Sequence, residues 1–210
     1  MMRDSDAMEN EPMTGDGPVP VHRAASRKPS DRTAAELALL GLIAQTENRE
    51  IHGYDLSRSF SDGVLGKIVR LEPGMLYHYL KKLAKAGLIT TRVERQVGRP
   101  DRQVHSLTLE GDSLLRDWVT APVRATRDIR IEFLLKLYLA RQLDPTHAAR
   151  LVADQQAIMR KRITNLRAQL DTPQPDDPES QFGETVLRLR LVQTEAALTW
   201  LDSLPEIAHA

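Results

Sequence analysis

The sequence predicts a mainly helical protein: a winged helix-turn-helix domain with a small β-hairpin wing, followed by a C-terminal helical dimerisation domain. Aromatic residues make up only 4% of the chain, so the core must be built mainly from aliphatic side chains, which suits helices. Residues 72–102 have the pattern of a helix, a glycine stop and a basic hairpin. Two long amphipathic segments fill much of the second half. Together these features indicate the fold class.

Composition narrows the class of protein further. The chain contains no cysteine, which excludes disulfides and thiolate metal sites and favours a reducing cytoplasm. The sequence has no apolar run near the roughly 20 residues of a membrane-spanning helix, and its first residues lack the features of a signal peptide. Basic and acidic residues balance at 29 each, so the net charge is uninformative about nucleic acid. We therefore expect a cytoplasmic protein without membrane contact.

The chain is expected to begin with a disordered tail over residues 1–32, which are polar, rich in proline and without periodicity. The second half of this tail is basic, and it could follow DNA phosphates or remain idle in solvent. Asp31 or Thr33 can cap the next helix, with Glu36 placed as in a capping box. That helix continues to Ala44 and is apolar on more than one face, so it should be central to its domain.

A second, shorter helix is expected over residues 51–60, after a turn at residues 46–50. Its Ile51, Tyr54 and Leu56 can reach a core. A further turn and a connecting stretch then lead to a basic third helix. Two short helices, a basic helix and a hairpin make a winged helix-turn-helix.

The third helix is the best evidence for what the protein does. It extends from residue 74 to about Ala86, and Leu76, Leu80 and Leu83 recur at the spacing of one buried face. Its other faces carry histidine and lysine, so the helix combines a core stripe with a cationic surface. Gly87 stands where a residue with positive φ ends a helix. This pattern is typical of a recognition helix.

The hairpin after this helix predicts a basic wing. Residues 88–93 are rich in β-branched side chains, and residues 104–108 follow a turn at residues 98–101. Between residues 67 and 102 the chain has nine basic and three acidic residues, a local excess of six positive charges. Binding to phosphates with release of counterions needs such a patch. An ordinary solvated face is the alternative, and it is disfavoured because both the helix and the hairpin tip carry cations.

The second half of the chain is expected to consist of four helices. Residues 110–120 and 127–140 form the first two, and a third extends from 146 to about 170 after a cap at Asp144 and Pro145. The last spans about residues 182–204. Two long amphipathic helices cannot bury their apolar faces on each other alone, so they must pack on something further.

Three segments carry a resemblance to a known family: HGYDL at 52–56, PGMLYHYLKKLAKAGLI at 73–89 and LTLEGDSLLRDW at 107–118. They resemble the winged-helix domain of PadR-family transcriptional regulators. The resemblance implies that the third helix enters the DNA major groove, that the wing follows the backbone, and that Tyr54 and Tyr77 lie near phosphates. The second wing strand departs from the family pattern at residues 102–106, where an aromatic beside a basic pair is usual.

The C-terminal half resembles the helical domain of larger PadR-type regulators and of the virulence-activator group, most clearly at residues 132–136. That domain dimerises by exchanging helices, which would place two recognition helices about one DNA turn apart. A monomeric helical bundle is the alternative. In some family members, aromatic residues at the dimer interface line a pocket for planar ligands. A small-molecule effector of unknown identity is therefore left open, although Trp118 is more simply explained by packing between the domains.

These features predict a homodimeric transcriptional regulator that binds double-stranded DNA and acts as a repressor. The expected divisions are a tail at 1–32, a DNA-binding domain at 33–120 and a dimerisation domain at 121–210. The residues expected to contact DNA are Tyr54, Gly74, Met75, Tyr77, His78, Lys81, Lys82, Arg92, Arg99 and Arg102.

Sequence motifs for catalysis, cofactors and metals are absent. The chain has no Gly-rich phosphate loop, no HExxH and no GxSxG, so we expect neither an enzyme nor a bound cofactor. His52 with Glu50 and Asp55 could in principle bind a metal, but a helix start near DNA explains these residues better. The alternative function is a protein-interaction module that uses the winged helix as a scaffold and binds partners through its C-terminal helices.

Overall fold

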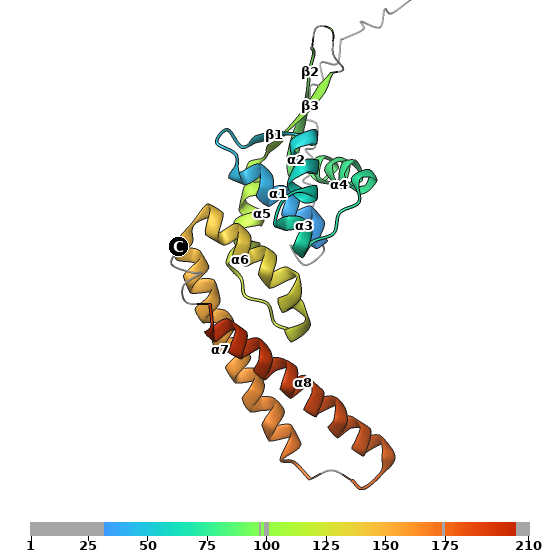
Figure 1. Cartoon of the computed structure of the whole chain (residues 1–210), viewed down its shortest axis with the longest axis vertical. Helices are drawn as coiled ribbons and strands as arrows, with labels where there is room; N and C mark the ends of the chain where they lie inside the picture. The colour runs from blue at the N-terminus through green and yellow to red at the C-terminus, as the bar shows by residue number, and fades with distance from the viewer. Residues whose placement is uncertain (1–31, 97, 99–100, 174, 205–210) are drawn as a thin grey trace, which may run out of the picture.

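A computed structural model describes residues 32–96, 98, 101–173 and 175–204 of the chain. Figure 1 shows a helical body that carries a β-hairpin at one end and a long pair of helices at the other. The fold is mainly helical with a small antiparallel sheet, as the sequence predicts. The predicted N-terminal tail lies outside the described residues except for Arg32.

Helix α1 (Ala34–Gln45) forms the centre of the body. Thr33 accepts a hydrogen bond from the backbone of Glu36, and the Glu36 carboxylate accepts one from the backbone of Thr33. This is the predicted capping box. The residues from Ala35 to Ile43 are all buried, so α1 is surrounded by packing on every side.

The predicted helix over residues 51–60 begins later than expected. Glu50–His52 forms strand β1, and α2 follows at Gly53–Ser61. The correction has a tertiary cause, because β1 pairs with a strand more than 50 residues away, with Ile51 opposite His105. Tyr54 does not reach the core and is 74% exposed, whereas Leu56 is fully buried. A one-turn helix, α3 (Leu65–Ile68), lies in the stretch that was expected to be irregular.

Helix α4 (Pro73–Lys85) and the wing follow in the predicted order. Leu76, Leu80 and Leu83 of α4 are buried, and Gly87 has the predicted positive φ of 73°. The wing consists of β2 (Ile89–Glu94) and β3 (Arg102–Leu107), which pair antiparallel. Strand β3 lies between β1 and β2, so the sheet has three strands rather than the two of the predicted hairpin.

Helix α5 (Leu109–Thr120) ends where the sequence indicates, but the next predicted helix is divided. Residues Thr126–Arg130 form a 3-10 turn, η2, and α6 extends from Glu132 to Leu143. Ile131 between them has φ −124° and ψ −62°, outside the helical region. Helix α6 then packs against α1, and a β-carbon on Gly41 would lie only 2.4 Å from Leu139.

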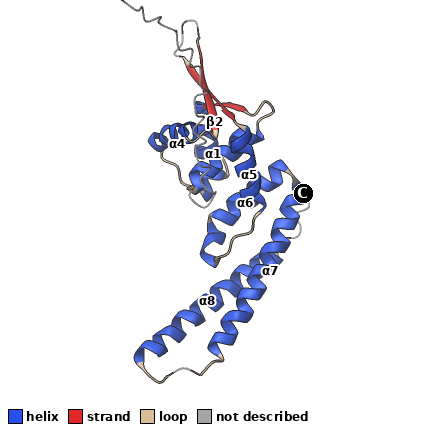
Figure 2. Cartoon of the chain, turned by 180° about the vertical axis from the view of Figure 1, so that it is seen from behind, coloured by secondary structure: helices blue, strands red, loops and turns tan. Residues whose placement is uncertain are grey.

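The last two helices, α7 (Pro145–Leu170) and α8 (Pro178–Asp202), form an antiparallel pair that extends away from the body (Figure 2). Asp144 caps α7 by accepting a hydrogen bond from the backbone of Thr146, as predicted. The apolar stripe of α7 is buried at Met159 and Ile163, among others. In α8, by contrast, three apolar residues are exposed: Phe182, Leu189 and Val192.

Candidate nucleic-acid interface

Helix α4 has one face in the core and an opposite face in solvent. The exposed residues of the outward face are Gly74, Met75, Tyr77, His78, Lys81 and Lys85. Met75 and Tyr77 are 41% and 56% exposed, although both have large apolar surfaces. Base edges in a major groove offer hydrogen-bonding groups and thymine methyl groups, so a mixed face of this kind can read them.

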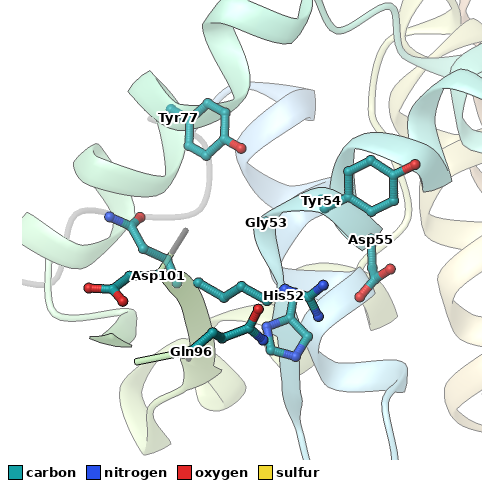
Figure 3. Close-up of a pocket in the computed structure, with 9 residues that line it drawn as sticks. His52, Gly53, Tyr54, Asp55, Tyr77, Gln96 and Asp101 are labelled. Atoms are coloured by element: carbon teal, nitrogen blue, oxygen red, sulfur yellow. The ribbon is translucent and has the colours of Figure 1, made fainter. Parts of the chain in front are cut away.

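A cleft of about 740 Å³ lies between the start of α2, helix α4 and the outer half of the wing (Figure 3). Its lining residues are His52, Gly53, Tyr54, Asp55, Tyr77, Gln96, Asp101, Arg102 and Gln103. Three residues predicted from the sequence to contact DNA, Tyr54, Tyr77 and Arg102, therefore come together from three different elements.

The start of α2 opens into this cleft. His52 is its N-cap and makes no side-chain capping bond. The first amide groups of a helix lack partners within the helix and carry partial positive charge, which attracts anions. Gly53 permits a close approach of α4, since a β-carbon there would lie 3.3 Å from the ring of Tyr77. The site thus combines a helix N-terminus with two tyrosine hydroxyl groups.

Carboxylates make the field of the cleft mixed rather than uniformly positive. Asp55 and Asp101 line it together with Arg102. On the neighbouring face of α4, Lys81 and Lys85 are exposed and have no ion-pair partner among the described residues. Within the described part of the chain, Lys81, Lys85 and Arg102 therefore offer unpaired positive charge to an anion beside the carboxylates of the cleft.

Two of the basic residues predicted to contact DNA have acidic partners within the chain. Nζ of Lys82 lies 3.1 Å from Oε2 of Glu36. The guanidinium of Arg92 lies 2.8 Å from Glu50 and 2.7 Å from Glu94. Hydrogen bonds from Arg92 and then from Ser106 lower the pKa of Glu50, which keeps this group charged. Charge counting along the sequence could not reveal this pairing.

The wing tip is described only in part. Arg99 lies outside the described residues, so its predicted role there stays a prediction. Gly98 has a φ of 74°, a conformation that favours glycine and fits a tight turn. Arg102 opens β3, and its backbone pairs with Glu94 at the outer end of the described ladder.

A buried histidine, His105, lies beneath the cleft and was not predicted from the sequence. His105 of β3 is only 2% exposed, and its Nδ1 lies 3.0 Å from the Thr91 hydroxyl. Its Nε2 has no hydrogen-bond partner within the described part of the chain. Burial and then the neighbouring charge of His52 lower the pKa of His105. The available signal was alternation along the strand, which places His105 on the same face of β3 as Leu107, a residue packed against the core.

The described residues form neither a metal site nor a membrane-spanning helix. Among the described residues, His, Asp and Glu do not gather in any group of three or more that could hold a metal ion. Within the same part of the chain, every helix is too short or too polar to cross a bilayer.

Comparison with known proteins adds two family matches. The transcriptional regulator PadR-like family matches residues 39–117, and the virulence activator alpha C-terminal family matches residues 129–207. The negative transcriptional regulator PadR of Bacillus subtilis (strain 168) is 27% identical over 173 residues, covering 80% of this chain and 93% of that protein.

Similar solved structures include Bacillus subtilis PadR in two complexes. The complex with operator DNA is 26% identical, covers 84% of this chain and 99% of that one, and has a TM-score of 0.41. The complex with p-coumaric acid is 25% identical, covers 85% and 100%, and has a TM-score of 0.38.

Proposed function

We propose that this chain, which belongs to the PadR-like family of transcriptional regulators rather than to a class of enzymes, is a cytoplasmic repressor that binds specific DNA as a homodimer. The family match supports regulation of transcription. The name of the Bacillus subtilis relative, a negative regulator, supports repression.

The observation that carries the proposal is the outward face of α4. Its Met75, His78 and Lys81 project from a helix whose other face is fixed in the core by three leucines. A rigid helix with exposed polar and apolar groups suits direct readout in the major groove. Tyr54, Tyr77 and Arg102 then contact phosphates, which position the protein without reading sequence. Gly74 lets the backbone of α4 approach DNA closely, since no atom lies within 4 Å of a β-carbon built there.

The proposed division of labour places DNA binding in residues 33–120 and dimerisation in residues 121–210. The exposed apolar residues of α8 support the second part. Phe182, Leu189 and Val192 of this helix are 69%, 56% and 62% exposed. Large apolar side chains exposed in one region often mark a protein interface. A second copy of the chain is the partner that the proposal assigns to them.

A small-molecule effector is part of the proposal, at a cleft of about 590 Å³ between α1, α5, α6 and the first turn of α7. Its lining combines the basic Arg49, Arg116 and His147 and the apolar Leu115 and Leu143 with three carboxylates, those of Asp112, Asp117 and Asp144. Asp112 pairs with both arginines and Asp144 with His147, so the cleft offers a small ligand polar groups of both signs beside an apolar wall. Bacillus subtilis PadR has been crystallised with p-coumaric acid, which makes that compound the first ligand to titrate.

The test of the function is fluorescence anisotropy with a labelled duplex from the region upstream of the gene, against a scrambled duplex, in a salt series. Specific recognition predicts binding to the upstream duplex about a hundredfold tighter or more, with a steep dependence on salt. Equal and weak binding to both duplexes would contradict the proposal. In that case a protein-interaction module becomes the better hypothesis, and a pull-down on the α7–α8 pair is the next experiment.

A further inference from the structure

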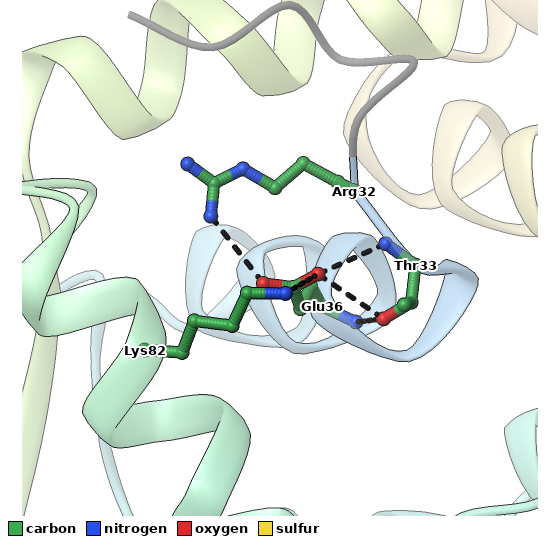
Figure 4. A network of polar contacts seen from close by, with 4 residues as sticks. All are labelled: Arg32, Thr33, Glu36 and Lys82. Atoms are coloured by element: carbon green, nitrogen blue, oxygen red, sulfur yellow. Dashed lines mark hydrogen bonds and ion pairs between the residues drawn. The ribbon is translucent and has the colours of Figure 1, made fainter.

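A buried carboxylate connects α1 to the recognition helix. Glu36 is fully buried, and its side chain accepts hydrogen bonds from Lys82 at 3.1 Å and Arg32 at 3.3 Å (Figure 4). It also accepts bonds from the backbone and the hydroxyl group of Thr33. Burial by itself raises the pKa of Glu36, but the bonds from Thr33 and Lys82 outweigh it and lower the pKa. The carboxylate is therefore charged at neutral pH.

The position of Lys82 on α4 would allow it to contact DNA directly. It follows His78 by one helical turn, and both therefore lie along the same side of the helix. Yet Lys82 and its neighbour Lys81 have different partners. Lys82 is bonded to Glu36, whereas Lys81 is exposed and unpaired among the described residues. Lys82 thus has an acidic partner within the protein, a carboxylate that it shares with Arg32.

The bond between Lys82 and Glu36 supplies an orientation that apolar packing does not. Leu80 and Leu83 bury α4 against the core, but the hydrophobic effect is non-directional and leaves small rotations of a helix inexpensive. A hydrogen bond is directional, and this one joins residues 46 positions apart in the chain. A buried carboxylate that loses a partner is costly, so the bond resists displacement of α4.

We propose that Glu36 is a positioning residue for DNA recognition, which holds α4 through Lys82 in the orientation that presents Met75, His78 and Lys81 to the bases. Lys82 acts through Glu36 and does not contact phosphate. This inference rests on the proposed function, since it requires that α4 reads DNA. Glu36 lies away from the DNA-facing surface, yet the inference gives it an effect on sequence discrimination.

The test compares Lys82→Met with Lys81→Met, two neighbouring substitutions of the same chemistry. Each variant is titrated with the upstream and the scrambled duplex over a salt series, at a temperature where circular dichroism shows it folded. Lys82→Met should lower the ratio of the two affinities by about tenfold, the discrimination that one base contact supplies. Its salt slope should match that of the wild type. Lys81→Met should weaken both duplexes and reduce the slope by about 0.9, if Lys81 contacts one phosphate.

Further variants separate positioning from a general loss of structure. Lys82→Arg keeps a donor within reach of Glu36 and should restore the affinity ratio. Glu36→Gln should lower the ratio as Lys82→Met does, and the double variant should be no worse than the more severe single one, because both remove the same bond. If Glu36→Gln fails to fold, the Lys82 variants alone still decide.

Two outcomes would overturn the inference. Lys82→Met could weaken both duplexes alike and flatten the salt slope, which would make Lys82 a phosphate contact. It could also leave the ratio and the slope as in the wild type, which would make the bond irrelevant to recognition. Failure of the proposed function looks different, because the wild-type protein itself would then not distinguish the two duplexes.

Discussion

At the scale of single residues, cations that are alike in the sequence differ in whether they have an acidic partner in the folded chain. Arg92 and Arg102 both lie on the wing and were expected to contact DNA. Glu50 and Glu94 hold Arg92, whereas Arg102 projects beside the cleft. Ion pairs at an exposed surface contribute little to stability, but they decide which charges remain available to a ligand. The positive charge that matters for DNA is therefore smaller than the sequence count.

This difference predicts opposite results for two arginine substitutions. Arg102→Gln should weaken binding to all duplexes alike and reduce the salt slope by about 0.9, because one phosphate contact is lost. Arg92→Gln should leave the slope near that of the wild type, since its guanidinium is already shared by two carboxylates. Anisotropy titrations from low to high salt measure both. A change of sequence preference in Arg102→Gln, with the slope intact, would contradict the role given to the wing.

A second residue-scale prediction concerns acid stability at the base of the wing. Burial, and then His52, lower the pKa of His105 in the folded state, while the unfolded chain has the ordinary value of about 6.5. Below that value the unfolded state binds more protons. Stability should be complete above about pH 6.5 and should fall as the pH drops from there toward the lowered pKa.

Thermal unfolding between pH 8 and pH 5 tests this prediction. His105→Asn should show a smaller loss of stability on acidification, because it removes the group that must be protonated, while its amide can still bond to Thr91. His78→Asn, which removes an exposed histidine from α4, is the matched control. If both variants lose as much stability as the wild type, then His105 does not cause the acid dependence.

At the scale of the elements, two helices pack closely where one of them has a glycine. Helix α6 approaches α1 at Gly41, where a β-carbon would lie 2.4 Å from one methyl group of Leu139 and 2.5 Å from the other. Leu139 is itself fully buried, so it has little space to move. The sequence pattern identified both helices as apolar, but it could not indicate that this glycine is the point of contact between them.

Gly41→Ala should therefore destabilise the protein despite the better helix propensity of alanine. Overpacking a core costs about 1–3 kcal/mol, whereas the gain in helix propensity is about 1 kcal/mol. Gly183→Ala is the control, because a β-carbon on Gly183 of α8 meets no atom within 4 Å. It should stabilise the fold by about 0.5–1 kcal/mol. Denaturant unfolding measures both, and a stabilised Gly41→Ala would show that the contact relaxes easily.

At the scale of the whole molecule, the segment between α5 and η2 ties the winged-helix body to the helices that follow it. The Gln155 amide of α7 accepts a hydrogen bond from the backbone of Val123 at 2.8 Å and donates one to it at 2.9 Å. Lys136 of α6 donates to the carbonyl of Ala121 and lies 4.9 Å from the Trp118 ring centroid. These bonds fix the segment between α5 and η2 against α6 and α7, so in the proposed dimer the arm would set the spacing of the two α4 helices.

The proposed association through α8 leads to a prediction about oligomeric state. The double substitution Leu189→Lys with Val192→Lys should convert a dimer to a monomer, because charges replace the apolar contact surface. Light scattering coupled to size exclusion gives the mass directly. Leu109→Lys, at a residue that is 85% exposed on α5, is the matched control and should remain dimeric. A double variant that stays dimeric would place the interface elsewhere.

The sequence by itself determined the features that depend on neighbours a few residues apart. The capping box at Thr33, the cap at Asp144, the positive φ of Gly87 and the leucine face of α4 were all predictable, because each is encoded within about one helical turn. The order of recognition helix and wing followed from the same local signals.

Only the tertiary structure decided what depends on distant partners. Strand β1 exists because β3 lies beside it, and Tyr54 is exposed because α2 begins later than its periodicity indicated. Lys82 is bonded to Glu36, which lies 46 residues earlier in the chain. Such pairings arise from burial and from the need of buried polar groups for partners, and neither is visible until the chain has folded.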